Sequence, residues 1–465
     1  MKKISKVWIG TLSFVFLFYN QGTGLNVAFL GLIVWFLLSL KAVRKEEKNM
    51  FWLLSFCCFL SSFSFAWYGD AISFFALVFS LLVFGLQSQY PRIKILLYPV
   101  LWFINYTGFI FKFFSFKHWL PKKITGNDFF KRLLAMVLIP GFLLFIFIVL
   151  YASSSDIFYS FFEAIPFNFN FFELVFLTCL GFFLSFNLWF VFIPKSVIRI
   201  NNQLGINFSS SKQTQLKPTF SFLEINFERK SGEISLIVLN ILLIFFIITY
   251  NYEQFFSIVK TGSLSDEIHQ RVATLIFSIV MAIGVIMFYF KSTFNFDKKA
   301  GLLKHLSYLW IILNSLLTIS AFVKNTEYIS DFGLTYKRIG VYIFLFLSLT
   351  GLLTTYLKIH CQKTNAFLLT RMLRIFFFTF IIAGFMNFSW IVTKYNITFH
   401  KTQDTGYLRS LNFNKQLLFN TYKNDPIWQK YFESERQEIN NEKSKNLLSS
   451  HLYFSTLNLN NKTAD

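Results

Sequence analysis

The stretch "SAFVKNTEYISDFGLTYKRIGVYIF", residues 320–344, places a short polar insert between two long apolar runs. Its acids are spaced for one face of a helix, and two adjacent cations follow the turn "DFGLT", in which Gly333 can adopt a positive φ. Such residues can form an ion-pair network inside a hairpin, or a site where Arg clamps a carboxylate or phosphate. The candidate side chains are Lys324, Glu327, Tyr328, Asp331, Lys337 and Arg338.

A second candidate is "GSLSDEIHQRVATLIFS", residues 262–278, whose functional side chains are Asp266, Glu267, His269 and Arg271. The acids fit the first turn of a helix, where they satisfy free amides, and Glu267 can pair with Arg271 four residues on. His269 titrates near neutral pH and could move protons. One histidine and two acids without a further ligand predict no metal site.

The strong catalytic signatures are missing from the sequence. It contains no phosphate-binding loop, no His-Glu-x-x-His, no Gly-x-Ser-x-Gly and no Cys-x-x-Cys. The four cysteines, at 57, 58, 179 and 361, form no disulfide framework. We therefore expect no cofactor and no metal, and we assign no catalytic residue; an enzyme is not favoured.

The elements that must position these side chains are membrane helices. Of 465 residues 55% are apolar, only 14% are charged and 67 are phenylalanine, more than a water-soluble core would bury. Runs of about 20 apolar residues predict an all-α polytopic membrane protein with about 11 (11–12) transmembrane helices and a short polar C-terminal tail.

Three parts are expected along the chain. Residues 1–132 form an N-terminal membrane segment with about four spans and a re-entrant or interfacial segment near 95–113. Residues 133–393 form a membrane domain with about seven spans and a cytoplasmic loop at 194–230. Residues 394–465 form the tail, which can fold into short amphipathic helices and whose end, "LNLNNKTAD", is expected to be disordered.

The distribution of positive charge predicts the orientation. Lys and Arg collect at the N-terminus and in segments 41–49, 87–132, 194–230, 291–304 and 358–374, and are scarce in the loops between. This asymmetry predicts a multi-pass protein of the cytoplasmic (inner) membrane, with a cytoplasmic N-terminus and an extracytoplasmic tail. It also accounts for the net charge of +21 without nucleic acid, so the lipid bilayer is the expected partner.

Polar side chains inside the predicted spans are mainly amides. Buried amides usually hydrogen-bond between or along helices, and less often line a polar pathway. The residues concerned are Asn187, Asn240, Asn314 and Asn387.

Three segments, "LSDEIHQRV", "SAFVKNTEYISDFGLTYKRIGVY" and "NFSWIVTKYNI", resemble segments that occur in the same order in a family of polytopic bacterial membrane proteins, the domain of unknown function 4153/4173 group. The similarity is most specific from Tyr328 to Arg338. Many members of that family have an acidic residue where Ser389 stands in this chain. The resemblance implies an integral cytoplasmic-membrane protein with a short extracytoplasmic tail, and it implies no activity.

Three functions remain open on the sequence. The first is a non-enzymatic envelope scaffold or sensor whose outer hairpins and tail bind an envelope protein. The second is a transporter or flippase for a small or lipid-linked solute. The third is a membrane enzyme that acts on an envelope lipid or glycan with Glu267, His269 or Asp331 as base.

Overall fold

The computed structural model describes residues 2–40, 48–115, 119, 136, 139–155, 170–209, 218, 224–256, 264–399 and 405–459. Within these ranges every regular element is a helix, and extended pairing is limited to one antiparallel bridge between Asn207 and Lys363. The all-α prediction is confirmed.

Seven helices of the described residues are long and apolar enough to cross a membrane. They are α3 (Lys48–Tyr68), α4 (Ala71–Gln89), α11 (Phe171–Trp189), α14 (Ile225–Phe256), α16 (Gly301–Phe332), α17 (Tyr336–His360) and α18 (Asn365–Phe385). The chain is therefore a polytopic membrane protein. Other apolar helices are α1 (Lys3–Phe18), α2 (Leu25–Ser39), α9 (Ile139–Ser154) and α15 (Leu264–Tyr289). The total of 11 or 12 spans, at about 20 residues each, stays a prediction.

Side-chain caps explain where several of these helices begin. Asp70 accepts a hydrogen bond from the amide of Ser73 at the start of α4, and Asn170 accepts one from the amide of Glu173 at the start of α11. Thr364 does the same for α18. Each cap satisfies an amide that has no partner within its own helix, which fixes the first residue of the helix.

The contacts divide the chain into two compact units, and each is described by itself. The first unit comprises residues 1–93, 97–198 and 437–456. In it α1 runs antiparallel to α11, since Lys6 lies over the ring of Trp189 at one end and the amide of Asn20 donates to Glu173 at the other. The two helices approach so closely that a Cβ on Gly181 would lie 2.9 Å from the Cβ of Phe14.

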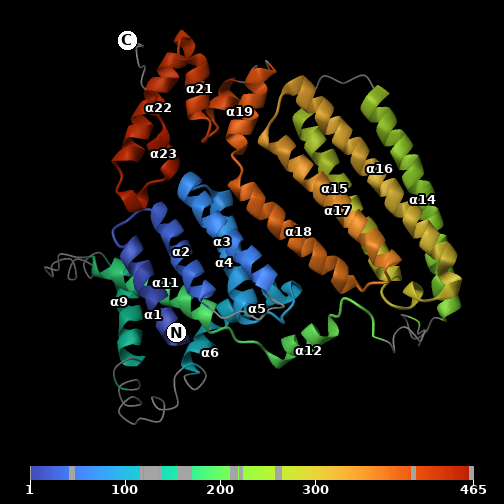
Figure 1. The fold of residues 1–465 in the computed structure, drawn as a ribbon, viewed down its shortest axis with the longest axis horizontal. Helices are drawn as coiled ribbons and strands as arrows, with labels where there is room; N and C mark the ends of the chain where they lie inside the picture. The colour runs from blue at the N-terminus through green and yellow to red at the C-terminus, as the bar shows by residue number, and fades with distance from the viewer. Residues whose placement is uncertain are drawn as a thin grey trace. The chain divides into compact units, whose positions relative to one another are not determined.

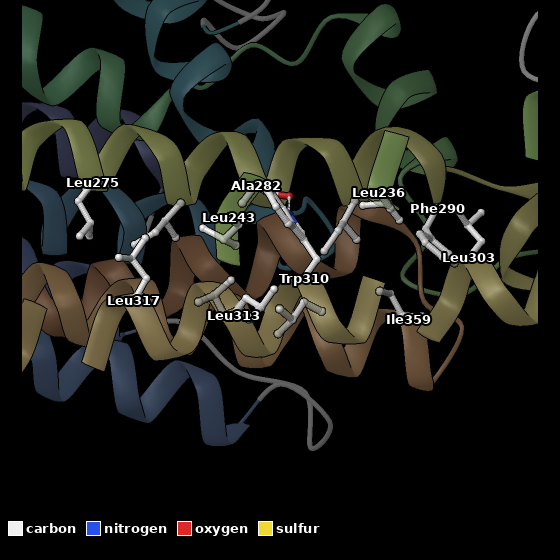
Figure 2. Close-up of a cluster of buried hydrophobic side chains, with 14 of the residues drawn as sticks. Leu236, Leu243, Leu275, Ala282, Phe290, Leu303, Trp310, Leu313, Leu317 and Ile359 are labelled. Carbon is white, nitrogen blue, oxygen red and sulfur yellow. Dashed lines mark hydrogen bonds between the residues drawn. The ribbon is translucent and has the colours of Figure 1, made fainter. Parts of the chain in front are cut away.

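The second unit comprises residues 94–96, 199–436 and 457–465. Its core lies between α14, α15, α16 and α17, as Figure 2 shows. The indole of Trp310 on α16 donates to the carbonyl of Ala282 on α15 at 3.2 Å. The fully buried Lys358 on α17 donates to the carbonyl of Phe290, directly after α15, so a cation closes the negative end of that helix.

The tail is a folded part of the molecule. It contains α20 (Thr405–Arg409), α21 (Lys415–Tyr422), α22 (Pro426–Ser444), a 3-10 turn at Leu447–Ser449 and α23 (Leu452–Thr456). In the first unit α23 lies at the ends of α2 and α3 (Figure 1).

The start of the segment that was expected to be disordered is ordered. Leu457 and Leu459 are buried, and Asn458 exchanges two hydrogen bonds with the side chain of Gln416, at 2.9 and 3.0 Å. Leu457 and Leu459 are therefore packed inside the folded tail, and the hydropathy of the sequence alone did not indicate this. Residues 460–465 lie outside the described residues.

Candidate functional site

The polar insert predicted from the sequence is the turn between α16 and α17. Gly333 follows the last residue of α16 and has φ +80° and ψ 177°, a conformation essentially restricted to glycine. Thr335 then caps α17 by accepting a hydrogen bond from the amide of Arg338. The predicted positive φ at Gly333 is confirmed.

The acids before this turn do not pair with the cations that follow it. Lys324 and Glu327 form an ion pair of 2.9 Å on the surface of α16. Arg338 donates to the carbonyl of Gly333 and lies over the ring of Phe332, so it satisfies backbone at the end of α16. Asp331 in the last turn of α16 and Lys337 in the first turn of α17 are exposed.

The turn is held by α19 (Phe388–Thr398), the helix that leads to the tail. The side-chain amide of Asn396 accepts from the amide of Leu334 at 2.7 Å and donates to its carbonyl at 2.9 Å. The hydroxyl of Tyr336 hydrogen-bonds that of Ser389, which is buried at the start of α19. These hydrogen bonds therefore join the α16–α17 turn, which lies in the most specific part of the motif, to α19.

The tail joins the same cluster. The hydroxyl of Tyr407 accepts from the amide of Tyr336 at 2.9 Å. Asn414 donates to the hydroxyl of Thr393 at 2.7 Å, and both of these side chains are buried. We call this set of contacts between the turn 333–336, α19 and residues 405–414 the clasp. Most of these polar groups hydrogen-bond one another, and the hydrogen bonds join the three segments.

The second candidate of the sequence analysis falls in the first turns of α15. Asp266, Glu267, His269 and Arg271 belong to this helix, but their side chains lie outside the described residues. Their role stays a prediction. Elsewhere in the described part of the chain, no three His, Cys, Asp or Glu residues gather into a group that could hold a metal ion.

The intramembrane asparagines hydrogen-bond to backbone. Asn187 and Asn314 donate to carbonyls four residues earlier in their own helices. Asn240 on α14 donates to its own helix and also to Leu306 on α16, at 3.1 Å. Asn387 caps α19 and donates to Phe413 of the tail. These contacts correspond to the packing role of buried amides in membrane helices.

A buried charge cluster in the second unit was missed by sequence reasoning. Arg229 at the start of α14 forms a 3.0 Å ion pair with Asp297, and Glu233 lies 2.8 Å from Lys230 and 4.0 Å from Arg229. The four-residue spacing of Arg229 and Glu233 was a signal that could have been used. Asp297 is far away in the sequence, and no local pattern indicated it.

A second missed group lies in the tail. Lys415 on α21 pairs with Glu435 on α22 at 2.5 Å, and both side chains are mostly buried. The guanidinium of Arg409 lies 4.3 Å from the ring centroid of Trp428. These contacts join the helices of the tail.

Comparison with known proteins gives one result. A family model matches residues 49–418 of the chain, and the family is described as a domain of unknown function (DUF4153). Neither the search of curated proteins nor the search of solved structures returns a match. The matched region includes the clasp.

Proposed function

Given that the chain belongs to the DUF4153 family, we propose that it is a non-enzymatic scaffold or sensor of the bacterial envelope. Its membrane helices hold a folded tail at one face of the inner membrane, where the tail presents a surface to an envelope protein. The observation that carries this proposal is the two-way hydrogen bond between Asn396 and the backbone of Leu334 within the clasp.

The clasp supports a scaffold better than a reaction centre. Acid–base catalysis needs titratable groups close together in a pocket. Here the acids of the turn are exposed or paired with a neighbour, and Arg338 is engaged with a carbonyl. A transporter or flippase remains the second candidate function, and a lipid- or glycan-modifying enzyme the third. No contact among the described residues of the clasp favours either of them.

The tail also contacts a loop in the first unit. The amide of Leu25 donates to the carbonyl of Ser450 at 3.0 Å, and the amide of Gly22 donates to the hydroxyl of Ser449 at 2.9 Å. The charge pattern assigns the loop at 20–24 to the outer side, the same side as the tail. We therefore keep the extracytoplasmic tail and the cytoplasmic N-terminus as parts of the proposal.

Replacing Asn396 with alanine is expected to release the tail. It leaves the amide and the carbonyl of Leu334 buried without partners, at about 1–3 kcal/mol for each group. We expect trypsin to cleave the tail of the purified full chain faster than in the unchanged protein. In cells that lack the protein, Asn396→Ala should then reproduce the phenotype of a chain without residues 405–465.

Two kinds of variant test the alternatives. Thr398→Ala changes an exposed residue of the same helix and is expected to leave cleavage and phenotype unchanged. Glu327→Gln and Asp331→Asn remove the exposed acids and are also expected to behave as the unchanged protein. Loss of function in either acid variant with the tail still protected would refute the scaffold and favour chemistry at the turn.

Sidedness is tested by labelling engineered cysteines in a background without the four native ones. A membrane-impermeant maleimide is expected to label Asp331→Cys and Lys430→Cys in intact cells, because both positions are exposed and predicted to face outward. Lys298→Cys, exposed at the opposite end of α16, should be labelled only after the membrane is opened. The reverse pattern would invert the proposed orientation.

A further inference from the structure

A cavity of about 580 Å³ opens in the first unit. It lies where the first turn of α1, the end of α11 and two short helices meet, α5 (Tyr98–Thr107) and α6 (Phe109–Phe114). Figure 1 shows these helices. Gly108 interrupts the helix, since it caps the end of α5 and the start of α6. Lys112 of α6 lines the cavity. This volume is in the usual range of small-ligand sites.

The ammonium of Lys112 is held by two amide oxygens. It donates to the Oδ1 of Asn187 at 2.5 Å and to the Oδ1 of Asn105 at 3.1 Å. The amino group of each asparagine donates to backbone carbonyls: that of Asn187 to Phe183, and that of Asn105 to Leu101 and Phe192. Both oxygens are therefore fixed toward the lysine. An ammonium has three donors, and the described residues accept two of them, which leaves one for a ligand.

Among the described residues, the cavity is lined by two lysines and by no carboxylate. Lys3 also lines it and lies 5.6 Å from the ring centroid of Tyr90. Among the described residues, neither Lys3 nor Lys112 has an acid within ion-pair distance, and the first turn of α1 contains no acid. The amides at the start of α1 add partial positive charge. A partly buried cation of this kind is stabilised by an anion.

Burial lowers the pKa of Lys112, which is outside the seven candidate spans, to about 8. An anion beside the ammonium would raise this pKa.

The remaining wall is mostly apolar. Phe111, Trp119, Phe186 and Phe190 line the cavity, and the ring of Phe186 lies 5.3 Å from the Lys112 ammonium. A free inorganic anion would leave this apolar wall uncovered, whereas an acyl chain would cover it. The geometry points to a binding site for an anionic lipid, with the phosphate between Lys112 and Lys3 and the chain along the phenylalanines. This site is independent of the proposed scaffold function.

The test uses the purified full chain in a neutral detergent, titrated with a fluorescent phosphatidylglycerol. Lys112→Gln is expected to weaken binding about 10- to 100-fold, since it removes a charge-assisted hydrogen bond. Lys112→Arg keeps the charge and should bind within a few-fold of the unchanged protein. The matched control is Lys195→Gln, an exposed lysine of the same unit that does not line the cavity. Its affinity should not change.

Three results would overturn the proposal: equal binding by Lys112→Gln, equal binding of a fluorescent phosphatidylcholine, or full displacement by millimolar inorganic phosphate. The last would assign the site to a free anion. If Lys112→Gln does not fold, Lys3→Gln at the exposed start of α1 serves as the second variant, and binding that is unchanged in it would also contradict the assignment.

Discussion

Replacing Asp297 with alanine is expected to lower the free energy of unfolding of the membrane helices by about 3–5 kcal/mol. The carboxylate lies 3.0 Å from the guanidinium of Arg229, and the two side chains are only 7% and 11% exposed. Without Asp297 the guanidinium remains buried beside fewer negative charges, and the amide of Lys299 loses its cap. Unfolding of the detergent-solubilised protein by sodium dodecyl sulfate, followed by circular dichroism, measures the loss.

Two controls separate the buried charge from the pair itself. Replacing both partners, Arg229→Leu with Asp297→Leu, is expected to recover most of the lost stability, because no buried charge is left unpaired. Glu327→Ala breaks the more exposed pair with Lys324 and should cost about 0–1 kcal/mol. The expectation fails if Asp297→Ala costs no more than Glu327→Ala.

Trp428→Ala is expected to destabilise the tail by about 3–5 kcal/mol, the usual cost of removing a buried aromatic side chain. The indole is 3% exposed and stacks on Tyr422, with ring centroids 4.5 Å apart and planes 4° from parallel. Its loss also removes the aromatic face on which Arg409 lies. Hydrogen exchange of the amides in α21 and α22 should speed up, with the membrane helices unchanged.

The neighbouring residue provides the matched control. Ile427 is 74% exposed, so Ile427→Ala is expected to leave exchange in the tail as it was. Equal protection in the Trp428→Ala variant would show that the tail does not depend on this aromatic cluster for its fold.

The α16–α17 turn shows how far local pattern reasoning reaches. The sequence placed a glycine-dependent turn at Gly333, and the backbone there has the expected positive φ. It also suggested that the acids before the turn would partner the cations after it. Glu327 instead pairs with Lys324, and Arg338 contacts the carbonyl of Gly333. Carbonyls at a helix end lack partners within the helix, and they compete with carboxylates for a nearby guanidinium.

The buried polar contacts show where that reasoning ends. Arg229 and Asp297, or Lys112 and Asn187, come from segments far apart in the sequence. Charge and hydropathy describe each of these residues as an ordinary polar group at the end of an apolar run. Only the packing of the helices brings them within hydrogen-bond distance.

The sequence by itself determined that this is an all-helical membrane protein and that a polar turn falls at Gly333. These properties are local: each apolar segment enters lipid by its own composition and must close its own backbone hydrogen bonds. The tertiary structure alone decided that Asn396 holds the turn, that the tail has a core, and that Lys112 faces an aromatic cavity. Those are distances between separate segments, and they exist only once the helices have packed.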